Sequence, residues 1–212
     1  MLRNIVLAGM IGTGTIGCTG KEELEKRSDE YETGPRIDNT ADLSNFDSDD
    51  ILVYTACDML DAYGRELRKR GRSYKGFSLR DRGDTWKGRY NGRDILVACN
   101  PEDLSGDYDI VNLRGHGSEM SNLYSDVKDH FADYTTLVFG GCDSSSMMDT
   151  YRNERVAFIG GSGEQDTVNN NYLILQLPKQ IDEAGSWESL ERNIKENSVR
   201  FHDFVSPATY NE

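Results

Sequence analysis

Two stretches of the chain, DIVNLRGHGS (residues 109–118) and TTLVFGGCDSS (residues 135–145), carry most of the information about its architecture. Each begins as a short run of apolar and β-branched residues, which is typical of a buried strand, and each ends abruptly in glycines. The glycines are followed or flanked by one imidazole, His116, and one thiol, Cys142. Neighbouring parallel strands end at one edge of a sheet. We therefore expect these two side chains to lie close together, although 26 positions separate them.

Further apolar runs and helix-like patterns surround these stretches. The sequence predicts strands over 51–57, 94–100 and 155–159, and helices over 59–70, 122–133, 169–183 and 187–199. We expect Pro178 to interrupt the third helix. The polar, glycine-containing segment 73–92 predicts a loop or a small hairpin. Strands that alternate with helices predict an α/β fold, namely a three-layer α/β/α sandwich around a mostly parallel sheet.

The length of 212 residues fits one domain with an N-terminal extension. Residues 1–18 contain one early arginine and then an apolar stretch, which predicts a signal peptide. Cys18 closes this stretch where a lipobox has its lipid-modified cysteine. Two alternatives stay open: export without a lipid, and a buried first strand with a glycine loop. Residues 19–49 are strongly acidic and lack apolar periodicity, so they predict a disordered spacer before a folded domain over 50–212.

The charge and the cysteines exclude several classes of function. The net charge is −13, and phosphate binding needs clustered Lys and Arg, so nucleic acid is not an expected partner. No pair of cysteines has the spacing of a metal site, and we expect neither a metal nor a cofactor. For Cys57 and Cys99 two readings stay open: a disulfide bridge, or two small buried hydrophobic side chains.

His116 and Cys142 form a candidate base and nucleophile. A free thiol with a pKa of about 8.5 is mostly protonated at neutral pH, so attack by sulfur needs a base within reach. The glycines beside both residues let a substrate backbone approach and let amide N–H groups point outward, as an oxyanion hole requires. The alternative for each residue alone is structural: a hydrogen-bonded histidine at a strand end, and a buried thiol.

In this order, and followed by VAFIGG (residues 156–161), the blocks resemble the caspase-like cysteine peptidases, the group of caspases, legumains, clostripain and gingipains. The match is best to gingipain-like or CHAT-type prokaryotic members and covers roughly residues 50–180. The resemblance implies a caspase-like sandwich and a cysteine endopeptidase that forms a thioester on Cys142. It implies His116 as the catalytic base, and the backbone N–H groups of Gly117 and Cys142 as the oxyanion hole.

The resemblance also implies a pocket for a charged or polar substrate residue, built from strand ends and the loops that follow them. Its candidate lining residues are Asp58, Asp143, Ser162, Glu164 and Asp166. An acidic lining would favour Arg or Lys before the cut bond. The expected partner is a peptide or protein substrate, and a lipid on Cys18 would tether the exported protein to a membrane at the cell surface. The runner-up is a catalytically inactive caspase-like module that binds partners or serves as a scaffold. The oligomeric state is left open.

Overall fold

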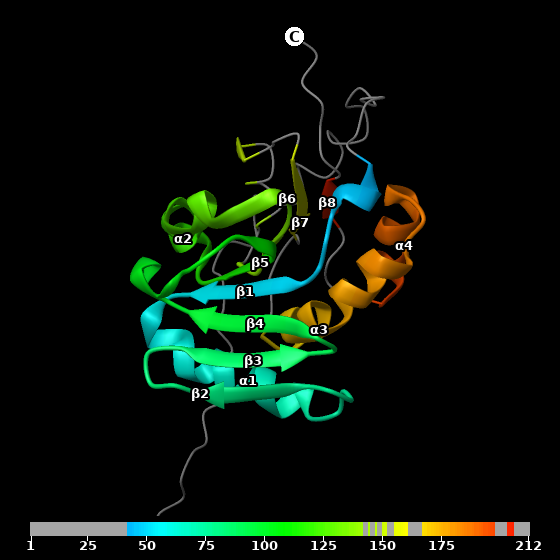
Figure 1. Ribbon diagram of the computed structural model, residues 1–212. Coiled ribbons are helices and arrows are strands. Elements are labelled where there is room, and N and C mark those ends of the chain that lie inside the picture. The colour runs from blue at the N-terminus through cyan, green and yellow to red at the C-terminus, as the bar shows by residue number, and fades with distance from the viewer. Residues whose placement is uncertain are drawn as a thin grey trace, which may run out of the picture.

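The protein is represented by a computed structural model. It describes residues 42–141, 144, 147, 150–151, 155–160, 167–197 and 203–205. The predicted signal peptide, the lipid site at Cys18 and most of the acidic spacer lie outside the described residues. Within them, eight strands form one sheet in the order β2-β3-β4-β1-β5-β6-β7-β8 (Figure 1).

The strands are β1 (Asp50–Thr55), β2 (Ser78–Asp81), β3 (Trp86–Tyr90), β4 (Arg93–Ala98), β5 (Tyr108–Arg114), β6 (Phe131–Phe139), β7 (Val156–Gly160) and β8 (Asp203–Val205). The helices are α1 (Leu60–Gly71), α2 (Met120–Val127), α3 (Thr167–Glu183) and α4 (Trp187–Asn197). Neighbours among β4, β1, β5, β6 and β7 pair in parallel. The β2–β3, β3–β4 and β7–β8 pairs are antiparallel. The predicted mostly parallel sheet is therefore confirmed.

Helices cover both faces of the sheet. Along β1, Ile51 and Val53 pack with residues of α1, α3 and α4, whereas Leu52 and Tyr54 pack with residues of α2. This alternation is what a strand buried on both faces requires, because successive side chains point to opposite sides. The fold is thus a three-layer α/β/α sandwich, as the sequence predicts.

Three predicted elements differ in detail. Segment 73–92 contains the antiparallel pair β2–β3, so of the two predicted alternatives the hairpin is confirmed. The helix expected over 122–133 ends at Val127, and β6 begins at Phe131, whose ring packs on Tyr124 with centroids 5.8 Å apart. Helix α3 runs through Pro178 without a break, which corrects the predicted interruption. Leu177 and Ile181 on either side of this proline are core residues, and tertiary burial overrides local propensity.

The packed core takes in residues that the sequence assigned to the spacer. Leu43 and Phe46, in and after a 3₁₀ turn (Leu43–Asn45), are buried against the α3 and α4 side of the sheet. Ser48 donates a hydrogen bond of 2.8 Å to Asp182 of α3 and accepts one of 3.0 Å from Arg93 of β4. These contacts hold the last part of the acidic segment on the folded domain.

No helix in the described part of the chain combines the length and the apolar character that crossing a membrane requires.

Candidate functional site

The candidate site lies at the edge where the parallel strands end. Strands β5 and β6 are parallel neighbours, with Leu113 in register with Phe139. The pairing continues past the end of β6, because the Gly140 N–H donates a hydrogen bond of 2.7 Å to the Leu113 carbonyl. The prediction that the two strands end side by side is confirmed.

The chain also reverses its direction across the sheet at this edge. From β1 it continues through α1, on one face, toward β2, β3 and β4. From β5 it continues through α2, on the other face, to β6. In open α/β sheets, ligands bind outside the carboxyl ends of the strands at such a reversal. His116 follows β5 and Asp58 follows β1, so both residues stand where this topology favours a ligand site.

The structure describes three of the predicted site residues: His116, Gly117 and Asp58. Asp58 is exposed in a 3₁₀ turn (Cys57–Met59) directly after β1. Gly117 opens a 3₁₀ turn (Gly117–Glu119), and the first N–H groups of a helix are not used inside it. The other candidates lie outside the described residues: Cys142, Asp143, Ser162, Glu164 and Asp166. The separation of His116 from Cys142 therefore stays a prediction.

His116 is exposed, and its backbone is fixed by a residue that the sequence analysis missed. The His116 N–H donates a hydrogen bond of 2.8 Å to Oε2 of Glu119, and the Glu119 N–H donates one of 2.8 Å to the His116 carbonyl. A glutamate three residues after a helix-capping position is a recognised spacing, so the sequence contained this signal. The pair of hydrogen bonds joins His116 to the end of the 3₁₀ turn that follows it.

The glycines at the two strand ends allow the chain segments to touch. A Cβ on Gly115 would lie 3.0 Å from Oε2 of Glu119. A Cβ on Gly141 would lie 3.0 Å from Cε of Met120 and 3.3 Å from the carbonyl oxygen of Gly115. The residue before Cys142 thus packs against the residue before His116. Close packing is a role for these glycines beyond the substrate access that the sequence suggested.

A buried cation lies beneath this edge. Arg114, the last residue of β5, is 1% exposed, and its guanidinium carbon lies 4.5 Å from the centre of the Tyr63 ring of α1. A Cβ on Gly140 would lie 2.8 Å from Cδ of Arg114, so the Arg114 side chain packs closely against the first residue after β6. Arg114 was not among the site residues predicted from the sequence. A charge at the end of the apolar run IVNLR was the available signal.

Further polar side chains are buried on the same face of the sheet as Arg114. Thr55 of β1 is in register with Arg114, and Asn112 lies two positions earlier on β5. Both are buried, and neither the Thr55 hydroxyl nor the Asn112 amide has a hydrogen-bond partner within the described residues. Buried polar groups without partners are uncommon in native proteins. Their position next to the strand ends is consistent with a functional edge.

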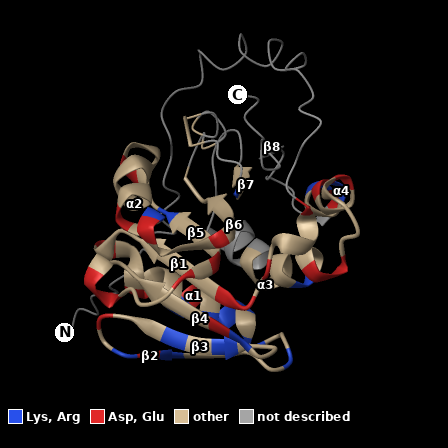
Figure 2. Ribbon diagram, turned by 45° about the horizontal axis from the view of Figure 1, so that its top comes forward, with Lys and Arg blue, Asp and Glu red and all other residues tan. Residues whose placement is uncertain are grey.

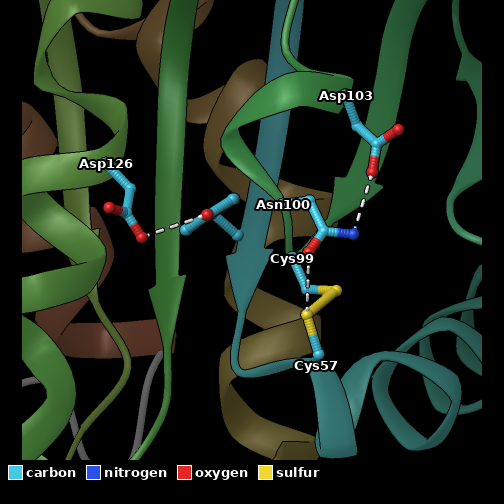
Figure 3. The surroundings of a disulfide bond; sticks show 6 residues. Cys57, Cys99, Asn100, Asp103 and Asp126 are labelled. Carbon is cyan, nitrogen blue, oxygen red and sulfur yellow. Dashed lines mark hydrogen bonds between the residues drawn. A yellow bond between two sulfur atoms is a disulfide. The ribbon is translucent and has the colours of Figure 1, made fainter.

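A disulfide closes the neighbouring part of this edge. Cys57, two residues past the end of β1, is bridged to Cys99, directly after β4, with Cα atoms 4.9 Å apart (Figure 3). Cys57 is exposed and Cys99 is half-buried, so the reading as two buried hydrophobic side chains does not hold for Cys57. Asn100 lies beside the bridge, with its Oδ1 3.4 Å from Sγ of Cys57, and donates a hydrogen bond of 3.4 Å to Asp103.

Helix α2 is fixed to the central strand by a tyrosine. The buried Tyr54 hydroxyl donates a hydrogen bond of 3.2 Å to Oδ2 of Asp126. Burial, together with the Asp126 charge, raises the pKa of Tyr54 above its usual range. The tyrosine therefore stays a donor at physiological pH and holds α2, which begins directly after the His116 turn, over β1.

No family model and no curated protein matches the chain. Two solved structures resemble parts of it. The large terminase of a thermophilic bacteriophage, in complex with ADP, aligns with a TM-score of 0.36 and 9% identity, over 63% of this chain and 40% of the terminase. A Plasmodium falciparum protein described as a putative nucleolar GTP-binding protein 1 aligns with a TM-score of 0.34 and 11% identity, over 72% of this chain and 91% of that one. The chain thus spans less than half of the terminase, and similarities of this size carry no argument about function.

Proposed function

We propose that the protein is a cysteine endopeptidase in which His116 and Cys142 act at the carboxyl edge of the sheet. The observation that carries the proposal is the parallel pairing of β5 and β6, which brings Gly140 onto Leu113 and Gly141 against Gly115. His116 is the next residue after Gly115, and Cys142 is the next residue after Gly141. The resemblance of the two sequence blocks to caspase-like peptidases supports the same reading.

The proposed reaction needs only these side chains, backbone N–H groups and water. His116 takes the thiol proton while the Cys142 sulfur attacks the substrate carbonyl carbon, and the Gly117 and Cys142 N–H groups stabilise the oxyanion. The C–N bond then breaks, and the imidazolium gives its proton to the leaving amine, which leaves a thioester. Water attacks this thioester while His116 accepts its proton, the C–S bond breaks, and the proton returns to sulfur.

For the substrate, we propose a basic residue before the cut bond. Asp58 supports this preference, because its exposed carboxylate lies at the end of the strand next to β5. Peptides that differ only in Arg, Lys, Gln or Asp at this position test it. Faster cleavage after Arg and Lys, reduced by Asp58→Asn, is the expected result, and equal cleavage of all four would refute the preference but not the peptidase.

The experiment for the reaction itself uses the full chain without a reductant. Because Cys57 and Cys99 are bridged, iodoacetamide should label Cys142 and, where no lipid is attached, Cys18. We expect labelling of Cys142 to abolish peptide cleavage, and Cys142→Ala and His116→Ala to lower kcat by at least about 10³-fold. Unchanged turnover in Cys142→Ala would refute the dyad. A chain without turnover whose Cys142→Ala variant keeps its biological effect would be the inactive binding module instead.

We further propose that the protein is exported and held at the membrane through a lipid on Cys18. The Cys57–Cys99 bridge supports export, since disulfides persist mainly in oxidising compartments. Cys18→Ser should move the protein from the membrane fraction to the soluble one. Retention of the variant in the membrane fraction would refute the lipid anchor.

A further inference from the structure

The basic residues of this acidic protein are concentrated in one region. Segment 65–93 holds eleven Lys and Arg but three Asp and Glu, in a chain whose net charge is −13. Figure 2 shows Lys and Arg gathered on β2, β3 and the adjoining turns, while Asp and Glu are spread over other elements. Segment 65–93 is thus positively charged, opposite in sign to the chain as a whole.

Some of these basic side chains form no ion pair within the described residues. Arg80 of β2 and Lys87 of β3 are exposed and directly opposite each other in the antiparallel register. Neither they nor the exposed Arg82 form an ion pair with any residue that the structure describes. Like charges directly opposite each other on neighbouring strands are destabilising. We call Arg80, Arg82 and Lys87 the basic face.

The basic face lies on the side of the hairpin away from α1. Leu79 and Trp86, the chain neighbours of Arg80 and Lys87, are buried in the core cluster that contains α1. Successive strand residues point to opposite faces, so the two cations point away from that helix. In Figure 1, α1 lies behind β2 and β3, and α2 lies apart from them near β5.

Strand β2 is also an edge of the sheet. Within the described residues it pairs with β3 alone. One side of an edge strand presents unpaired N–H and C=O groups, to which an extended polypeptide can add as a further strand. Charged side chains on an edge strand can also serve to prevent such pairing. That explanation accounts for Arg80 but not for Lys87, because β3 is an interior strand paired on both sides.

We propose that β2 and the basic face bind an acidic polypeptide segment in extended conformation, which pairs with the edge of β2 and places carboxylates near Arg80 and Lys87. A polypeptide is the occupant that uses both features, since a lipid or a phosphate cannot continue the backbone pairing of a sheet. The surface lies on β2 and β3, whereas His116 follows β5, and the inference does not depend on the proposed peptidase activity.

The test measures binding of a fluorescein-labelled peptide of alternating Glu and Val to the full chain carrying Cys142→Ala, by fluorescence anisotropy. The double variant Arg80→Glu, Lys87→Glu should bind at least about tenfold more weakly, a loss of about 1.4 kcal/mol. Lys179→Glu, Lys195→Glu makes the same charge change on α3 and α4 and should bind nearly as well as the parent. Circular dichroism checks that both variants fold.

Two further probes distinguish the occupants. The same peptide with N-methyl groups at alternate backbone nitrogens cannot pair as a strand and should bind at least about tenfold more weakly. Vesicles of anionic phospholipid should not bind through Arg80 and Lys87. Equal losses in the two double variants, undiminished binding of the N-methylated peptide, or binding of vesicles in place of the peptide would each overturn the proposal.

Discussion

Oε2 of Glu119 accepts a hydrogen bond of 2.8 Å from the backbone N–H of His116. The carboxylate thereby fixes the backbone of the proposed base, although it does not touch the imidazole in the contacts that the described residues make. We treat Glu119 as a positioning residue for His116.

Glu119→Ala should lower kcat by about 10- to 100-fold with little change in KM, because a misplaced catalytic group weakens the reaction more than substrate binding. Glu119→Gln keeps an acceptor oxygen at the same place and should retain most of the activity. Peptide cleavage kinetics of both variants check this. Equal losses in Ala and Gln would show that the charge, rather than the hydrogen bond, matters.

The bridge between Cys57 and Cys99 closes a loop with a sequence separation of 42. Cys57→Ser, Cys99→Ser should lower the free energy of unfolding by about 2–4 kcal/mol, mainly because the unfolded chain gains freedom. Urea unfolding of the parent and of the double variant without a reductant measures the difference. A reductant should lower the stability of the parent alone, and equal sensitivity of the two proteins would contradict this account.

Burial raises the pKa of Asp109, although the Asp49 and Asp50 N–H groups donate hydrogen bonds of 3.0 Å to its Oδ2. The folded chain therefore holds this proton more firmly than the unfolded chain does. Its contribution to stability falls as the pH rises from the usual aspartate range through the folded pKa. Asp109→Asn keeps an acceptor oxygen and removes the charge.

Asp109→Asn should therefore raise the free energy of unfolding more, or lower it less, at pH 7 than at pH 4. Urea unfolding at the two pH values measures it, with Asp129→Asn, an exposed aspartate, as the matched control. A benefit that is the same at both pH values, or larger at pH 4, would contradict the assignment.

Gly88 of β3 lies so close to β2 that an added Cβ would be 1.9 Å from the carbonyl oxygen of Ser78. Gly88→Ala should therefore displace β2 and lower the free energy of unfolding by about 1–3 kcal/mol. At Gly185 an added Cβ meets no atom within 4 Å, so Gly185→Ala is the matched control. Thermal unfolding compares the two, and similar midpoints would mean that β2 does not pack as described.

Much of the fold follows from local sequence patterns. The apolar runs gave β1, β4, β5, β6 and β7, because a strand buried on both faces reads as a continuous apolar segment. The helices predicted after β1 and between β5 and β6 indicated parallel neighbours for these strands. Strand β8 has three residues, Asp203–Val205, and its pairing with β7 is a long-range contact that no local pattern indicates.

The site was predictable in its location but not in its supporting contacts. Glycines and reactive side chains after two apolar runs indicated the edge that holds His116. The roles of Arg114 and Glu119 depend on what surrounds them in space: the Tyr63 ring in one case, and the turn of the His116 backbone in the other. For Glu119 the capping spacing after His116 was an available signal, whereas the contact of Arg114 with Tyr63 joins β5 to α1 and has no local signal.

The position of the Cys57–Cys99 bridge also affects how cleavage of this chain would be observed. The exposed turn at Gly83 lies inside the loop that the bridge closes. A cut there, by another protease or by a second copy of the protein, would leave two fragments joined by sulfur. The nicked protein would migrate as one band in a denaturing gel until a reducing agent is added, so intactness must be judged on reduced samples.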